Sequence, residues 1–274
     1  MPSRVQRTEH LPDFDRPPLN EVVFGVQFAP AKGYSQVRAW EVWQLYRQDY
    51  PLVQEREALV PTFETFGPPS AGLMMGGLNF VTGALHDRFW FLRQTEDELL
   101  QFQQDRLLHN WRRVGDRSIE YPRYEKMAER FSTELERLEK YFSGLSTQSL
   151  NINQCEISYI NHIEGEIGAP PRPIEWLRFA SFEGQEPENI SVAFRDVIRS
   201  NDHRPIGRFI CECASGISPL GKPILVLTLT VRGTPSSGGR ESALDFIHHG
   251  RDLIVQKFAE LTTAAAHVVW GRRK

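Results

Sequence analysis

The fold is decided by residues 121–145, which read YPRYEKMAERFSTELERLEKYFSGL. Pro122 suits the first turn of a helix, and Gly144 suits its end. Apolar side chains recur every three or four positions, at Tyr124, Met127, Phe131, Leu135, Leu138, Phe142 and Leu145. This spacing predicts an amphipathic helix that lies across a sheet or another helix. The stripe is short for a coiled coil, so packing in the core is the favoured interpretation.

The residues before this helix have the pattern of a sheet. Residues 22–28 are rich in Val and Phe and predict a buried strand, after which Ser35 begins a helix that ends near Tyr50. Short segments separated by Gly and Pro predict further strands at 57–63, 73–81, 88–94 and 99–102. The turn at 95–97 makes a hairpin, and we expect its second strand to continue through a bulge to Trp111.

The residues after the helix repeat this order of strands and then a helix. Four strands are predicted, at 150–163, 190–198, 208–217 and 224–231, and one long terminal helix is predicted over 243–268. The predicted fold is α+β, with an antiparallel sheet or sheets backed by long amphipathic helices. Two arrangements fit, a pair of pseudo-repeated halves or a ferredoxin-like elaboration.

The chain divides into three predicted parts. Residues 1–20 carry four prolines and are expected to form an extended N-terminal arm. Residues 21–146 form a first α+β half and residues 147–274 a second, and we expect the two halves to pack as one compact unit.

Composition limits the classes of function. The 274 residues are 40% hydrophobic and 24% charged, which is typical of a globular protein. With 32 Lys and Arg against 35 Asp and Glu, the net charge of -3 offers no general attraction to nucleic acid. No signal peptide and no long apolar run is recognised, and three cysteines do not make a disulfide framework. We therefore expect a cytoplasmic protein with no membrane association.

The most distinctive candidate site lies within residues 101–125. Guanidinium and aromatic groups there could grip a phosphate, a carboxylate or a stacked base. The candidate binding residues are Arg106, His109, Trp111, Arg112, Arg123 and Tyr124. The competing interpretation is a solvated face whose arginines pair with neighbouring acidic residues. No catalytic residue, metal ligand or cofactor site is predicted.

Several short motifs are similar to those of a known family. They are PPLNEVVF at 17–24, QFQQDR at 101–106 with NWR at 110–112, YPRYE at 121–125, YINHI at 159–163 and HVVWG at 267–271. Together they resemble a sporadically distributed, uncharacterised prokaryotic family of about this length. The resemblance implies an accessory role, such as phage defence or a toxin–antitoxin partnership. It implies no reaction and no functional residue.

Three functions fit these features. The leading hypothesis is a non-enzymatic binding or interaction protein that holds a protein partner or self-associates, because packing stripes are well specified while no reacting group is. The alternative is a hydrolase or nuclease-like enzyme for a phosphate substrate, which requires the cluster at 106–124 to converge on one concave surface. The third is an RNA-binding protein, which requires exposed aromatic side chains on the sheet. The net negative charge disfavours nucleic acid.

Overall fold

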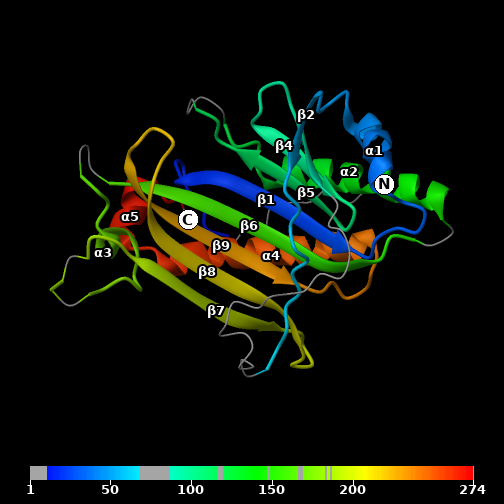
Figure 1. Ribbon diagram of the computed structural model, residues 1–274. Helices are drawn as coiled ribbons and strands as arrows, with labels where there is room; N and C mark the ends of the chain where they lie inside the picture. Colours follow the sequence, from blue (N-terminus) through cyan, green and yellow to red (C-terminus); the bar gives the residue numbers. More distant parts are fainter. Residues whose placement is uncertain are drawn as a thin grey trace.

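The computed structural model describes residues 11–67, 87–115, 120–146, 149–165, 169–182, 184–185 and 187–273. Within these residues one antiparallel sheet of nine strands joins helices in a mixed α+β fold (Figure 1). The α+β class predicted from the sequence is therefore confirmed. The predicted strand at 73–81 lies outside the described residues.

The sheet has the strand order β2-β3-β4-β5-β1-β6-β9-β8-β7. Its strands are β1 (Leu19–Phe28), β2 (Leu52–Arg56), β3 (Arg88–Leu92), β4 (Glu98–Gln103), β5 (Arg106–Arg112), β6 (Ile152–Glu164), β7 (Ser191–Arg199), β8 (Pro205–Ile217) and β9 (Pro223–Gly233). β1 and β6 pair at its centre, with Phe24 opposite Ile157. The β2 to β5 meander returns to β1, and the β7 to β9 meander returns to β6. Duplication of the two halves stays a prediction.

Two long helices contact the same side of this sheet. The helices are η1 (Gln36–Arg38), α1 (Ala39–Tyr46), α2 (Tyr124–Leu145), α3 (Pro173–Trp176), α4 (Arg240–Leu261) and α5 (Ala264–Val269). The Phe131 ring of α2 lies 5.8 Å from that of Phe24 in β1. Gly250 of α4 lies against Ile157 of β6 and Val231 of β9. Because Phe24 and Ile157 are register partners, both helices lie on one face, as Figure 1 shows.

Two predicted elements have different boundaries. Residues 99–111 are two strands joined by a tight turn at Gln104 and Asp105, not one bulged strand. The Asp105 carboxylate accepts a hydrogen bond from Gln103 Nε2 and pairs with Arg106, which stabilises the turn. The predicted terminal helix breaks between α4 and α5, where the Thr263 hydroxyl accepts a hydrogen bond from the Ala266 N–H and caps α5.

The predicted strand at 57–63 was wrong. Residues 57–67, here called the strap, are extended but join no strand. Their polar contacts go instead to side chains of the sheet face opposite the helices, across which the strap runs from β2 toward β8 (Figure 1). A composition rich in Val, Phe and Thr favours an extended backbone. To become a strand of the sheet, the segment must also lie beside a strand whose backbone groups are still unpaired.

The opposite face of the sheet is unusually polar for a covered surface. Along β1, Val22, Phe24 and Val26 point to the helices, and side chains alternate across a strand, so Gln27 points to the strap. Polar side chains that are nearly buried on this face are Gln27, Gln103, Ser158 and Thr230. The strap thus covers hydrogen-bonding groups instead of an apolar core.

Because α4 lies close to the sheet, we expect Gly→Ala to destabilise the protein at Gly250 of α4 and to stabilise it at Gly144 of α2. In Gly250→Ala the new Cβ would stand 2.8 Å from Ile157 Cγ2 and 2.9 Å from Val231 Cγ1. We expect a loss of about 1–3 kcal/mol in the free energy of unfolding. Gly144 in α2 has nothing within 4 Å of such a Cβ, so Gly144→Ala should gain about 0.5–1 kcal/mol. Urea denaturation measures both, and equal effects would contradict the close packing of α4.

Candidate functional site

The six predicted binding residues do not share one surface. On β5, His109 and Trp111 point to the helix side and are fully buried, whereas Arg106 and Arg112 occupy the alternate positions. Arg106 is nearly buried and pairs with Asp105 at 3.1 Å.

The remaining members are also separated. Arg112 donates to the Glu96 carbonyl oxygen at 3.1 Å and lies over the Trp90 ring. Tyr124 is buried at the start of α2, while Arg123 beside it is exposed, 3.8 Å from Asp13. The structure therefore brings none of the arginines into a shared site with His109.

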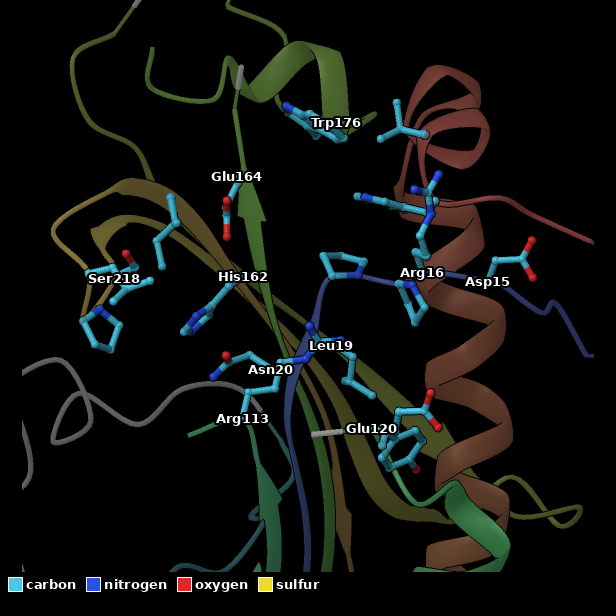
Figure 2. A pocket seen from close by; sticks show the side chains of 18 of the residues that line it. Asp15, Arg16, Leu19, Asn20, Arg113, Glu120, His162, Glu164, Trp176 and Ser218 are labelled. Atoms are coloured by element: carbon cyan, nitrogen blue, oxygen red, sulfur yellow. The ribbon is translucent and has the colours of Figure 1, made fainter. Parts of the chain in front are cut away.

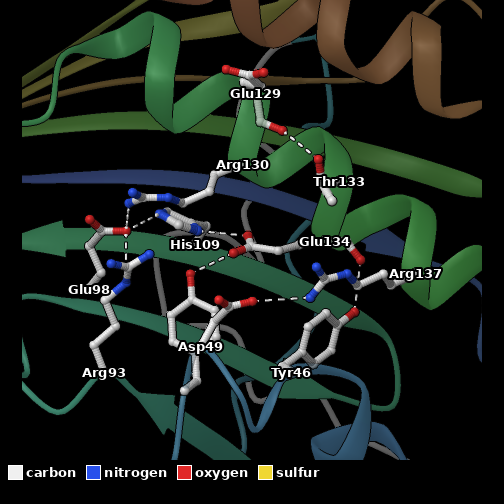
Figure 3. A network of polar contacts seen from close by, with 11 residues as sticks. Tyr46, Asp49, Arg93, Glu98, His109, Glu129, Arg130, Thr133, Glu134 and Arg137 are labelled. Atoms are coloured by element: carbon white, nitrogen blue, oxygen red, sulfur yellow. Dashed lines mark hydrogen bonds and ion pairs between the residues drawn. The ribbon is translucent and has the colours of Figure 1, made fainter.

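A buried polar network surrounds His109 instead (Figure 3). Its Nδ1 lies 2.7 Å from Oε2 of Glu134 on α2, and its Nε2 lies 3.7 Å from Glu98 on β4. The Tyr50 hydroxyl donates to the other Glu134 oxygen at 2.5 Å, and the Tyr46 hydroxyl donates to the Glu134 carbonyl at 2.8 Å. Burial, then the Glu134 charge, raises the pKa of Tyr50, so this phenol stays a donor.

This network is internal. Glu98 also contacts Arg130 and lies 3.4 Å from Arg93, so two carboxylates flank one imidazole within the core. His109 is fully buried, and a substrate has no route to its ring. We interpret the network as a device that fixes α2 on the sheet. A glutamate at position 134, beside Leu135 on the apolar stripe of the helix, was the sequence signal for it.

A concave site lies elsewhere, at the end of the sheet where β1 begins (Figure 2). This cleft has a volume of about 680 Å³. Six separate parts of the chain line it, namely residues 15–20, residues 113, 115, 120, 121 and 123, residues 162 and 164, Trp176, residues 218–220 and 224, and residues 269 and 270. Portions of four motifs that carry the family resemblance meet there, although they are far apart in the sequence.

One wall of the cleft is aromatic. The Trp176 ring of α3 stacks on that of Trp270 at 5.6 Å, and Trp270 stacks on Phe258 of α4 at 5.2 Å. The Trp176 indole N–H is buried without an acceptor among the described residues. A buried donor without a partner costs about 1–3 kcal/mol, so an acceptor brought to this edge would be stabilising.

Four polar side chains of the cleft have no hydrogen-bond or ion-pair partner within the described part of the chain, namely Arg16, Asn20, Glu120 and His162. Figure 2 shows Asn20 and His162 close together, with Arg16 across from them on the side of Trp176. Burial lowers the pKa of His162, so its ring is neutral near pH 7 and carries one donor and one acceptor nitrogen.

Two acidic side chains of the cleft pair with basic side chains that lie outside it. Asp15 pairs with Arg273, and Glu164 lies 3.8 Å from Lys222. The Arg16 guanidinium lines the same cleft and has no ion-pair partner among the described residues, and the same is true of the Glu120 carboxylate. The sequence analysis proposed none of Arg16, Asn20 and His162 as a site residue, because no single segment contains the site.

Other chemistry has no support among the described residues. No group of three or more His, Cys, Asp or Glu there could hold a metal ion, and none of the described helices is long and apolar enough to cross a membrane. The cysteines at 155, 211 and 213 are buried and unpaired, and burial raises their pKa values, to about 12 for Cys211. The thiols are therefore protonated and unreactive.

No protein-family model matches this chain, and no curated protein matches it significantly.

A buried histidine orders the wall behind Trp270. Arg272 Nη1 donates to Nδ1 of His267 at 3.1 Å, so Nε2 carries the proton and donates to the Thr262 hydroxyl at 2.8 Å. That hydroxyl donates to the Phe258 carbonyl. Burial, together with Arg272 and Arg178, lowers the pKa of His267.

Removal of the Glu134 carboxylate should be far more damaging than removal of its exposed neighbour. Glu134→Ala strands the Tyr50 hydroxyl and His109 in the core, and we expect a loss of about 3–5 kcal/mol in the free energy of unfolding. Glu136 on the same helix pairs with Arg240 at the surface, so Glu136→Ala should cost less than about 1 kcal/mol. Comparable losses in urea denaturation would contradict the structural role of the network.

Stability should fall in mild acid because of His267. Above pH 6.5, the ordinary pKa of the ring, the folded and unfolded chains are both neutral there. As the pH falls through 6.5, the unfolded chain binds a proton that the folded chain resists, so the free energy of unfolding decreases until the lowered folded pKa is reached. His267→Gln should flatten the fall of Tm between pH 7.5 and 5, while His249→Gln on the exposed side of α4 should not. Parallel curves for all three proteins would refute this assignment.

Proposed function

We propose that the protein is a non-enzymatic binding protein that holds a small anionic molecule with a flat apolar part in the cleft. The observation that carries the proposal is the set of Arg16, Asn20 and His162, which have no side-chain partner among the described residues and lie around a cleft with stacked tryptophans in its wall. A small number of placed polar groups against an apolar wall is typical of ligand sites.

The anionic character of the ligand follows from the donors. A guanidinium offers only donors, in a planar fork that matches a carboxylate or a phosphate. Asn20 and a neutral His162 can each donate and accept, so they supply orientation without adding charge. The tryptophan and Tyr121 rings offer apolar area for the rest of the molecule.

Binding is favoured over catalysis because the described residues of the cleft do not include a nucleophile hydrogen-bonded to a base. His162 has no carboxylate or hydroxyl partner among the described residues to orient it. Ser218 lines the cleft, but its hydroxyl accepts a hydrogen bond from the Lys222 N–H. The alternative enzyme hypothesis needed Arg106, His109 and Arg123 on one surface, and their separation favours a binding protein.

The test compares three probes by calorimetry and thermal shift, namely inorganic phosphate, benzoate and adenosine monophosphate. We expect the probes with a ring to bind more tightly than phosphate and to raise Tm, because ligand binding to the folded state alone stabilises it. Arg16→Ala should weaken binding about tenfold or more, since a hydrogen bond to a charged group contributes about 1.5–3 kcal/mol.

The matched control is Arg195→Ala, an exposed arginine on β7 outside the cleft. It should bind the probes as the wild type does. The proposal fails if no probe binds at millimolar concentration, or if the Arg16 and Arg195 variants lose affinity equally.

A further inference from the structure

We propose that the polar face of the sheet is a docking surface for an extended acidic segment of a partner protein, and that the strap occupies this surface in the free protein. The inference concerns the opposite end of β1 from the cleft and does not depend on the cleft's ligand.

Two glutamines hold the strap by its backbone. Oε1 of Gln103 accepts the Leu59 N–H at 2.8 Å, and its Nε2 donates to the Leu59 carbonyl at 3.0 Å. Gln27 makes the same pair of hydrogen bonds with Thr62, at 3.0 Å and 2.7 Å. Each carboxamide therefore makes the two backbone hydrogen bonds that a neighbouring strand would make in a sheet. Such contacts recognise a peptide group and not a side chain, so extended segments of other sequences can satisfy them.

The positions of both glutamine side chains are fixed by the sheet. Gln103 is 1% exposed, and its Nε2 also donates to Asp105 at 3.1 Å, which fixes the orientation of the amide. Gln27 is 9% exposed on the central strand β1. If the strap left, both would keep their positions in the sheet and present unpaired donors and acceptors.

Two arginines beyond the glutamines lie beside an acidic residue of the strap, and one of them, Arg232, also pairs with Glu156 of β6 at 2.7 Å. Arg208 of β8 and Arg232 of β9 are direct register partners, and like charges placed opposite each other are destabilising. Glu64 of the strap lies between them, 2.7 Å from Arg208 Nε and 3.7 Å from Arg232 Nη1. The Phe66 ring lies 5.0 Å from the Arg208 guanidinium. Charge complementarity therefore selects an acidic side chain two positions after the residue held by Gln27, and favours an aromatic one two positions later.

The strap is fitted for replacement, because it buries little apolar surface. Of its large hydrophobic side chains, Val60, Phe63 and Phe66 are exposed and Leu59 is half-buried. Its polar contacts with the sheet are the two backbone pairs, the carboxylate contact and a hydrogen bond from Arg208 to the Thr65 carbonyl, which another segment of the same type can reproduce. As part of the same chain the strap has a high effective concentration, so a partner must compete with it.

The test uses the full chain with residues 57–67 replaced by a Gly-Ser segment of equal length, and a fluorescent peptide EALVPTFETFG, which is the strap sequence. By fluorescence anisotropy, the peptide should bind this variant at least tenfold more tightly than it binds the wild type. Adding Gln27→Ala to the variant should weaken binding about tenfold, whereas adding the exposed Gln48→Ala should not change it. A peptide in which Glu64 is changed to Lys should bind more weakly.

Two results would overturn the proposal. One is a folded variant, judged by circular dichroism and Tm, that does not bind the peptide. The other is a variant that binds a single-stranded RNA or DNA oligonucleotide more tightly than the peptide, which would make the face a nucleic-acid surface. If the replaced variant does not fold, Glu64→Lys in the full-length protein loosens the strap. Peptide affinity must then rise above that of the wild type, and an unchanged affinity refutes the proposal.

Discussion

The structure depends on the pairing of β1 with β6 at the centre of the sheet. This pair joins the two meanders into one sheet, and Phe24 and Ile157, which face each other across it, also carry α2 and α4. Gly25 allows the next strand to lie close, since a Cβ there would stand 2.6 Å from Leu108 Cδ2. Both proposed surfaces are built on β1, the cleft at its first residues and the strap contact at Gln27.

The two faces of the sheet differ in the kind of contact that covers them. The helix side is largely apolar, and in its polar network around His109 the Glu134 carboxylate satisfies a histidine and a tyrosine hydroxyl at once. Buried charges of this kind are weak sources of stability, but they are costly to break, so they specify how α2 lies on the sheet. The strap side uses amides and ion pairs, and these permit exchange where a packed apolar layer would not.

Much of the fold could be predicted from the sequence because local patterns of apolar residues indicate the helices and strands. The helix at Tyr124–Leu145 follows from its apolar stripe, and most strands follow from short β-rich runs. The strap could not be distinguished from a strand, because pairing depends on an edge that the segment itself does not contain. The alternation along β5 already separates Arg106 from His109, so the candidate cluster could have been divided by period alone. The cleft has no local signal, since six separate segments form it.

The first and last described segments of the chain are joined beside the cleft. The Asp15 and Arg16 N–H groups donate to the carbonyls of Gly271 and Trp270, both at 3.0 Å. A molecule that contacts both Arg16 and Trp270 therefore acts as a noncovalent crosslink that closes a loop of almost the full chain length. The entropic cost of closing a loop grows with the length of the loop. A molecule bound in the cleft would therefore oppose the separation of these two segments, with which unfolding from either end would begin.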